Sequence, residues 1–339
     1  MTTSNRQIHL ASRPDGEPTA ANFRLVEAPL PSLRENQVLV RNHYLSLDPY
    51  MRGRMNEGKS YAQPQALDAV MVGGTVGEVV ESRHAGYKAG DKVVGYGGWQ
   101  QYSVVPAGQP GVLRKVDTAR VPLSAYLGAV GMPGVTAWVG LHKIIEAKTG
   151  ETVVVSAASG AVGGVVGQLA KAAGCRAVGI AGGAEKCDYV VRELGFDACI
   201  DYKRHAGAAA IAEALRHACP NGIDGYFENV GGAILDAVMS QANAFSRIAM
   251  CGMISGYNGE PIPMAAPQLI LLNRMKVQGF IVSEHMPLWP QALSELGQRV
   301  ANGTLKYRET EAQGLESAPE AFIGLLKGRN FGKQLVKLV

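Results

Sequence analysis

Residues 152–173, which read TVVVSAASGAVGGVVGQLAKAA, constrain the fold more than any other part of the chain. Val153, Val154 and Val155 form a continuous apolar run, which is typical of a strand buried on both faces of a parallel sheet. A turn of small residues and an apolar helix with a glycine-dense first turn follow. The stretch therefore predicts the strand, turn and helix that open a doubly wound, dinucleotide-binding domain.

The turn carries part of a phosphate-binding fingerprint. Gly160 and Gly163 stand where a diphosphate approaches the backbone and where the helix packs close to its strand. The free N–H groups at the start of a helix also attract anions. Ala158 replaces the first glycine of G-x-G-x-x-G, so a strand-helix turn that merely needs small residues is the alternative. We predict that the cofactor contacts Ser159, Gly160, Ala161, Val162 and Gly163.

The end of the second predicted strand, 176–180, indicates which dinucleotide binds. An NAD site expects an acid there for the ribose hydroxyls, but this strand runs into Gly182 and Gly183. Lys186 opens the next helix, and Tyr202, Lys203 and Arg204 follow the third predicted strand, 198–201. Cations without the acid favour the extra phosphate of NADP(H), with contacts at Gly182, Lys186 and Tyr202. The alternative is that Lys186 is a solvated helix residue.

Length and composition set the broad class. A chain of 339 residues suggests two domains, and 47% hydrophobic with 18% charged residues is typical of an ordinary globular protein. The net charge of +4 is small and its cations are dispersed, which excludes a nucleic-acid partner. We find neither an apolar run that approaches a membrane span nor a signal-peptide core, and we expect a cytoplasmic protein.

The cysteines point the same way. All five lie in the second half of the chain, without a C-x-x-C pair. We therefore expect neither disulfides nor a zinc site.

The chain divides into three segments by pattern. Residues 1–125 hold short strand candidates between Pro and Gly turns, which predicts a β-rich, barrel-like substrate domain. Those strands are 23–27, 37–45, 70–81, 92–94 and 101–105. Residues 126–302 alternate strands and helices, as a full doubly wound α/β sheet requires. The six strands are 153–156, 177–180, 198–201, 225–228, 247–251 and 277–282. Residues 303–339, with a helix over 317–326 and a strand over 333–338, return to the first domain.

Several motifs, in this order along nearly the whole chain, carry a family resemblance. They are LDPYMRGRM (47–55), GMPGVTAW (131–138), SAASGAVGGVVGQLAK (156–171), GGAEKCDYVVRELGFDACIDYK (182–203), FENVGG (227–232), CGMISGYNG (251–259) and KGRNFGKQLV (327–336). The sequence resembles the zinc-independent branch of the medium-chain dehydrogenase/reductases, which contains prostaglandin reductases, plant alkenal double-bond reductases and bacterial NADPH-dependent curcumin reductase. The resemblance implies a GroES-like barrel domain and a Rossmann domain.

The residues also argue against the zinc site of other members of this fold. Zinc alcohol dehydrogenases need a cysteine and a histidine in the first domain, yet no cysteine precedes Cys175 in this chain. Val72-Gly73-Gly74-Thr75 stands where the zinc relatives carry Gly-His-Glu. Without a metal to polarise a carbonyl, reduction of an activated C=C bond is the better chemistry.

The resemblance implies hydride transfer from NADPH to the β-carbon of an α,β-unsaturated ketone or aldehyde, such as curcumin, an alkenal or an oxo-prostaglandin-like enone. Tyr257 matches the tyrosine that serves as donor to the resulting enolate. The alternative is a loop tyrosine that only holds the cofactor. Tyr50 is the second phenol candidate, or else a turn residue that anchors the barrel. We expect a salt bridge within the barrel at Arg52, and the alternative is that Arg52 attracts a carboxylate-bearing substrate. We also expect a wider pocket at Gly256, where many relatives have glutamine.

Further cofactor contacts follow from the family motifs. They are Met132, Thr136, Asn229, Cys251, Gly252, Ile254, Ser255, Tyr257 and Asn330. If Asn330 in the returning tail reaches the cofactor, binding ties the domains together and closes the cleft. The resemblance also implies a homodimer. A zinc-free NADPH:quinone reductase and a non-catalytic NADPH-binding protein remain the alternatives.

Overall fold

The computed structural model describes residues 4–109 and 111–339, and the chain forms two compact units. One is the continuous segment Gly128–Arg308, and the other joins Met1–Leu127 to Glu309–Val339.

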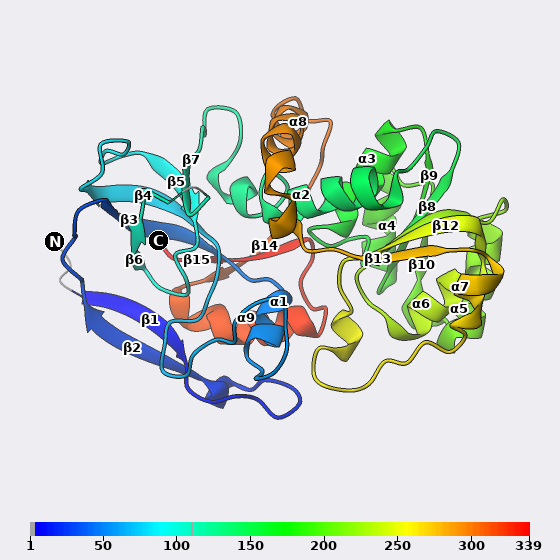
Figure 1. Ribbon diagram of the computed structural model, residues 1–339, viewed down its shortest axis with the longest axis horizontal. Coiled ribbons are helices and arrows are strands. Elements are labelled where there is room, and N and C mark those ends of the chain that lie inside the picture. Colours follow the sequence, from blue (N-terminus) through cyan, green and yellow to red (C-terminus); the bar gives the residue numbers. More distant parts are fainter. Residues whose placement is uncertain (1–3, 110) are drawn as a thin grey trace. The chain divides into compact units, whose positions relative to one another are not determined.

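The continuous unit is built on a parallel sheet of six strands in the order β10-β9-β8-β11-β12-β13 (Figure 1). This is the doubly wound order, which reverses direction between β8 and β11. Helices α3 and α4 cover one face of the sheet, and α5 and α6 cover the other (Figure 1). The strands are β8 (Thr152–Ser156), β9 (Arg176–Ala181), β10 (Ala198–Asp201), β11 (Ile223–Glu228), β12 (Ala242–Met250) and β13 (Lys276–Gly279). The predicted Rossmann fold is confirmed.

The helices of this unit precede, connect and follow these strands. They are α2 (Met132–Val139), α3 (Gly163–Ala172), α4 (Ala184–Arg192), α5 (Gly207–Ala218), α6 (Gly232–Ser240), α7 (Gln268–Leu272) and α8 (Trp289–Ala301). A π-helical segment, Gly140–Ile145, continues α2. Strand β8 lies in the middle of the sheet and every residue of it is buried, which explains its unbroken valine run.

The two-part unit contains a mostly antiparallel sheet, in the order β14-β15-β3-β4-β5-β7, with β6 paired to β3. The hairpin β1-β2 is a separate sheet. The strands are β1 (Ser4–Leu10), β2 (Phe23–Pro29), β3 (Gln37–Ser46), β4 (Thr75–Ser82), β5 (Lys92–Gly95), β6 (Tyr102–Pro106), β7 (Leu113–Lys115), β14 (Glu309–Gln313) and β15 (Lys333–Lys337). The helices are α1 (Tyr50–Arg54) and α9 (Ala318–Leu326).

An aromatic cluster joins the early and late segments of this unit. The Trp99 ring is fully buried, stacks on Phe23 at 5.5 Å and meets Phe322 of α9 edge-on at 5.7 Å. Strand β15 pairs with β3 in addition. The segment Glu309–Val339 therefore completes the core that the segment Met1–Leu127 begins.

Three predicted strands differ from the structure by at least three residues at one end. The predicted strand 70–81 begins only at Thr75, because Gly73 lies against the Leu45 and Trp99 side chains in an irregular segment. The predicted strand 277–282 already ends at Gly279. The predicted strand 247–251 begins earlier, at Ala242, because that residue pairs with Ile223 across a register shift.

Candidate cofactor and active site

The glycine-containing loop lies between β8 and α3, and its turn is held by backbone bonds. Gly160 N donates to Ala157 O at 2.9 Å, and Gly164 N donates to Gly160 O at 3.0 Å. A Cβ atom on Gly163 would lie 2.4 Å from Ala157 O, which is closer than real Cβ contacts allow. The loop therefore needs glycine at position 163 so that α3 can begin against the end of β8, with its first N–H groups directed at the loop.

The missing first glycine of the fingerprint has a packing explanation. Ala158 is fully buried, and its methyl group lies 2.8 Å from where a Cβ atom of Gly179 would stand. Gly179 of β9 therefore provides the space that the side chain of Ala158 fills. No local pattern indicates this compensation, because the two residues meet only when β8 and β9 pair.

A pair of lysines gathers at the end of β9. A Cβ atom on Gly182 would lie 2.9 Å from Tyr202 Cε1 and 3.0 Å from Lys203 Cε, so both side chains cover this glycine. Burial lowers the pKa of Lys186, and the nearby charge of Lys203 lowers it further. The structure thus brings the predicted residues Gly182, Lys186 and Tyr202 together, and it adds Lys203.

The carboxylate of Asp201, at the end of β10, is already used by the backbone. Asp201 Oδ1 accepts hydrogen bonds from Gly183 N at 2.7 Å and from Lys203 N at 3.1 Å. A carboxylate held in this way fixes the two loops that carry the lysines. The site has the donor set for a phosphate, since the ammonium groups of Lys186 and Lys203 lie near one another beside Gly182.

Asn229 lies at the point where the strand order of the sheet reverses. Its side-chain Nδ2 donates to Ser156 O at 2.8 Å, and its backbone N donates to Ser156 Oγ at 2.8 Å. These bonds tie the carboxyl end of β11 to that of β8. The crevice at such a reversal is where open α/β sheets bind their ligands.

The loop after β12 holds five predicted residues: Cys251, Gly252, Ile254, Ser255 and Tyr257. Its backbone is bonded to the turn after β11, and Ser255 Oγ donates to Val230 O at 2.6 Å. The Tyr257 hydroxyl accepts a hydrogen bond from Met253 N at 3.4 Å and lies 2.9 Å from where a Cβ atom of Gly252 would be. Because Gly252 has no side chain, the Tyr257 phenol can lie over the loop to which both residues belong.

At Gly256, the space next to the Cβ position is occupied, and the expectation of a wider pocket stays a prediction. The side chain of Ile262 approaches to 3.0 Å from where a Cβ atom would stand. Isoleucine thus fills the space beside the glycine.

Met132 and Thr136 lie one turn apart at the start of α2. Thr136 Oγ1 donates to Met132 O at 2.8 Å and lies 3.7 Å from Met132 Sδ. The pair therefore shares one face of the helix, and the hydroxyl oxygen keeps acceptor capacity for a ligand.

Tyr50 and Asn330 belong to the two-part unit. Tyr50 begins α1, where burial raises the pKa of its phenol well above the ordinary range and the carboxylate of Asp48 raises it further. Asn330 Nδ2 donates to Gly332 O at 2.7 Å in the turn before β15. Arg52 is buried and donates to Asn56 Oδ1 and to Gly16 O, both at 2.6 Å. These neutral oxygen atoms replace the salt bridge expected there.

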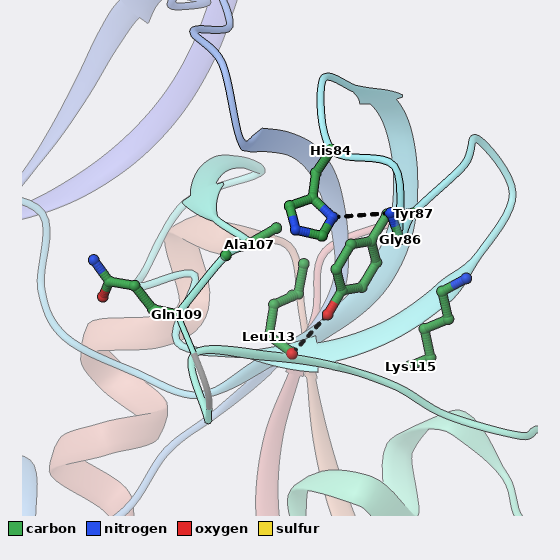
Figure 2. A pocket seen from close by; sticks show the side chains of 8 residues that line it. His84, Gly86, Tyr87, Ala107, Gln109, Leu113 and Lys115 are labelled. Atoms are coloured by element: carbon green, nitrogen blue, oxygen red, sulfur yellow. Dashed lines mark hydrogen bonds between the residues drawn. The ribbon is translucent and has the colours of Figure 1, made fainter.

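A surface hollow in the same unit brings none of the predicted residues together. Figure 2 shows the His84 ring accepting from Gly86 N at 3.0 Å and the Tyr87 hydroxyl donating to Leu113 O at 2.8 Å. Lys115 Nζ lies 5.5 Å from the centre of the Tyr87 ring and pairs with Asp91. The His84 ring, the Tyr87 hydroxyl and the Lys115 ammonium group therefore already have partners.

Neither a metal cluster nor a membrane-spanning helix occurs in the described part of the chain. Residues 4–109 and 111–339 contain no group of three His, Cys, Asp or Glu side chains placed to hold a metal ion. No helix among these residues is long and apolar enough to cross a membrane.

Comparisons with known proteins agree with this geometry. A family described as the N-terminal domain of oxidoreductase matches residues 6–113, and one described as zinc-binding dehydrogenase matches residues 161–298. The chain is 48% identical to the NADPH-dependent curcumin reductase of Escherichia coli, over 98% of this chain and 97% of that protein. It is 43% identical to the NADP(+)-dependent 2-alkenal reductase of Nicotiana tabacum, over 98% and 97%. The crystal structure of CurA from Vibrio vulnificus in complex with NADPH superposes with a TM-score of 0.91 at 48% identity, covering 98% of this chain and 99% of that one.

Proposed function

The chain belongs to the medium-chain dehydrogenase/reductase family, in the branch of the curcumin and alkenal reductases, and we propose that it is an NADPH-dependent reductase of the C=C bond of enones and enals. The observation that carries the cofactor part of the proposal is the lysine pair beside Gly182, with Asp201 held by the backbone. This arrangement offers cations to the extra phosphate of NADPH and leaves the carboxylate committed elsewhere.

Separate groups of residues fit the separate parts of the cofactor. The loop of Ser159, Gly160, Ala161, Val162 and Gly163 would hold the diphosphate, since its glycine leaves no Cβ atom in the way. Gly182, Lys186, Tyr202 and Lys203 would hold the ribose phosphate. The nicotinamide half would contact Met132, Thr136, Asn229, Cys251, Gly252, Ile254, Ser255 and Tyr257. We assign cofactor binding to residues 126–302, and the substrate to residues 1–125 with 303–339.

When bound, NADPH supplies a hydride, which adds to the β-carbon of the substrate with its electron pair. The C=C electrons then move to the carbonyl oxygen, and the resulting enolate takes a proton at the α-carbon. Tyr257 would donate a hydrogen bond or a proton to this enolate, because its phenol lies over the loop that would border the nicotinamide. Tyr50, as a neutral phenol, would be a second donor near the substrate.

We propose that the reaction needs no zinc. The support comes from the ligand residues: no cysteine precedes Cys175, and the segment 72–75 offers neither imidazole nor carboxylate. The substrate would therefore be polarised by phenol and backbone donors.

We further propose a cytoplasmic homodimer. All five cysteines are free thiols, as a reducing compartment predicts. Strand β13 ends the six-stranded sheet, and the nearby Leu271 and Leu272 of α7 are 77% and 60% exposed. An unpaired strand edge beside exposed apolar side chains suits a second copy of the chain.

The test is NADPH oxidation by metal-free protein with a panel of enones, enals and quinones, with NADH as the paired control. We expect turnover of enones with NADPH that chelators do not inhibit. Tyr257→Phe should lower kcat by about 10²-fold or more, as expected for loss of a general acid, with little change in NADPH affinity. Turnover of quinones alone would favour the quinone reductase, and a silent panel would favour the binding protein.

A further inference from the structure

Glu228 is a buried carboxyl group that the proposed reaction does not use. It is the last residue of β11, its side chain is 0% exposed, and burial raises its pKa. Its Oε1 accepts hydrogen bonds from Ser156 Oγ at 2.8 Å and from Val230 N at 2.5 Å. A buried carboxyl is costly for a fold to keep, so its position at the ligand-binding edge of the sheet needs a reason.

The carboxyl group fixes the turn that carries Asn229. Ser156 Oγ donates to Glu228 and accepts from Asn229 N at 2.8 Å, so one hydroxyl links the two residues. The bond to Val230 N holds the next residue of the turn. Glu228 thus sets the backbone on both sides of the asparagine.

This turn in turn holds the loop after β12. The Glu228 backbone O accepts from Cys251 N at 2.9 Å and from Gly252 N at 3.1 Å. The carbonyl groups of the turn continue the pattern: Asn229 O accepts from Ile254 N at 3.2 Å, and Val230 O accepts from Ser255 N at 3.1 Å. The Tyr257 phenol rests on the loop fixed in this way.

We propose that Glu228 is a positioning residue, which holds the turn 229–232 and through it the loop 251–257, so that the Tyr257 phenol is in place before the cofactor arrives. The proposal rests on the proposed function for the role of Tyr257. Glu228 itself touches none of the reacting atoms. Its contribution is to remove freedom from two loops that would otherwise have to be ordered during binding and reaction.

The experiment compares two replacements at this position with a control on the same strand. Glu228→Gln keeps an oxygen that accepts from Val230 N and Ser156 Oγ, whereas Glu228→Leu has a similar volume and no acceptor. The control is Asp224→Leu at the opposite end of β11, where the carboxylate accepts from Thr152 N at 2.8 Å and from Asn243 Nδ2 at 2.8 Å. Both leucine variants remove a side chain that accepts a hydrogen bond from β8. Only Glu228→Leu removes it next to the turn that holds the Tyr257 loop.

The first readouts need no turnover. In the cofactor-free protein, we expect Glu228→Leu to increase amide hydrogen exchange across 251–257, and to weaken NADPH binding by about tenfold to hundredfold. Glu228→Gln should restore both to near the wild-type values. Asp224→Leu should lower the melting temperature without either effect.

The kinetic readout asks whether Glu228 acts through the phenol. Glu228→Leu should lower kcat on an enone in the wild-type background and have a much smaller effect in Tyr257→Phe, because the donor that it positions is absent there. A glutamine variant as impaired as the leucine variant would overturn the proposal, as would unchanged exchange across 251–257. If no enone is reduced by the wild-type protein, the proposed function fails, while exchange and NADPH affinity still decide the role of Glu228.

Discussion

The ammonium group of Lys333 in β15 lies 2.7 Å from Asp48 Oδ1, and the two side chains are only 4% and 8% exposed. Lys333 Nζ also donates to Leu47 O at 2.7 Å, and Ser46 Oγ donates to the second carboxylate oxygen of Asp48. These two residues are 285 positions apart in the sequence and form a buried ion pair. Asp48 lies two residues before Tyr50. The pair lies just before α1, which begins at Tyr50, the second phenol candidate.

Replacement of this lysine is the first prediction. Lys333→Met leaves the Asp48 carboxylate buried without its cation, which should lower the free energy of unfolding by about 3–5 kcal/mol. Urea unfolding followed by circular dichroism measures the change. The double variant Asp48→Asn with Lys333→Met should regain part of the loss, and a double variant no more stable than Lys333→Met would contradict the pairing.

The second prediction concerns the lysines beside Gly182. Lys186→Ala and Lys203→Ala should each weaken NADPH binding by about tenfold to hundredfold, the effect of one charged hydrogen bond, and leave NADH binding unchanged. Arg192→Ala, at the exposed far end of the same helix α4, is the matched control. Equal losses for both cofactors would show that the lysines do not recognise the phosphate.

The third prediction concerns the glycine loop. Gly163→Ala places a methyl group 2.4 Å from Ala157 O, whereas in Gly160→Ala the distance to the same oxygen is 3.1 Å. We expect the first variant to be destabilised by about 1–3 kcal/mol and the second by less. Thermal unfolding of the two variants, side by side, measures the difference. Equal stability of the two variants would mean that the helix can shift to accept the methyl group.

The fourth prediction follows from the carboxyl group of Glu228. Burial raises its pKa above the ordinary value of 4.5, so the folded protein holds this proton more tightly than the unfolded chain does. The resulting stabilisation is complete below pH 4.5 and is lost as the pH rises through the folded-state pKa. The free energy of unfolding of the wild type should therefore fall relative to that of Glu228→Gln as the pH rises.

Two titratable neighbours do not disturb this comparison. Burial, with a smaller effect of Glu228, raises the pKa of Cys251 to about 12 and that of Tyr226 well above its usual range. Both groups stay protonated at neutral pH. Urea unfolding of the two proteins at a series of pH values provides the test, and parallel curves would mean that Glu228 titrates alike in both states.

Much of the fold was predictable from local pattern. The valine run of β8 predicts a central strand because burial on both faces requires apolar residues throughout. Strand ends were less predictable. The sequence around Gly73 continues the apolar pattern, yet the backbone leaves the sheet there because Leu45 and Trp99 take the space beside it. Such contacts depend on residues far away in the chain.

The candidate site divides in the same way. Gly163, Gly182 and Lys186 follow from spacing along the chain, because a phosphate needs small residues and cations at the ends of strands. The packing of Ala158 on Gly179 and the bonds from Ser156 to Glu228 were not predictable, since each joins two strands of the sheet. In the sequence, FENVGG is a family motif that points to Asn229, and only the paired strands give its glutamate a partner.

The pairing of β15 with β3 also decides when the two-part unit can complete its folding during synthesis. The segment Met1–Leu127 lacks β14, α9 and β15, while Gly128–Arg308 is continuous and can fold as soon as it has been made. At about 5–20 residues per second, the roughly 180 intervening residues take on the order of 10–40 s. Throughout that interval Trp99 and its neighbours lack Phe322, so the nascent chain carries an unfinished apolar core. We expect a chain truncated after Arg308 and released from the ribosome to have a folded nucleotide domain and a protease-sensitive barrel.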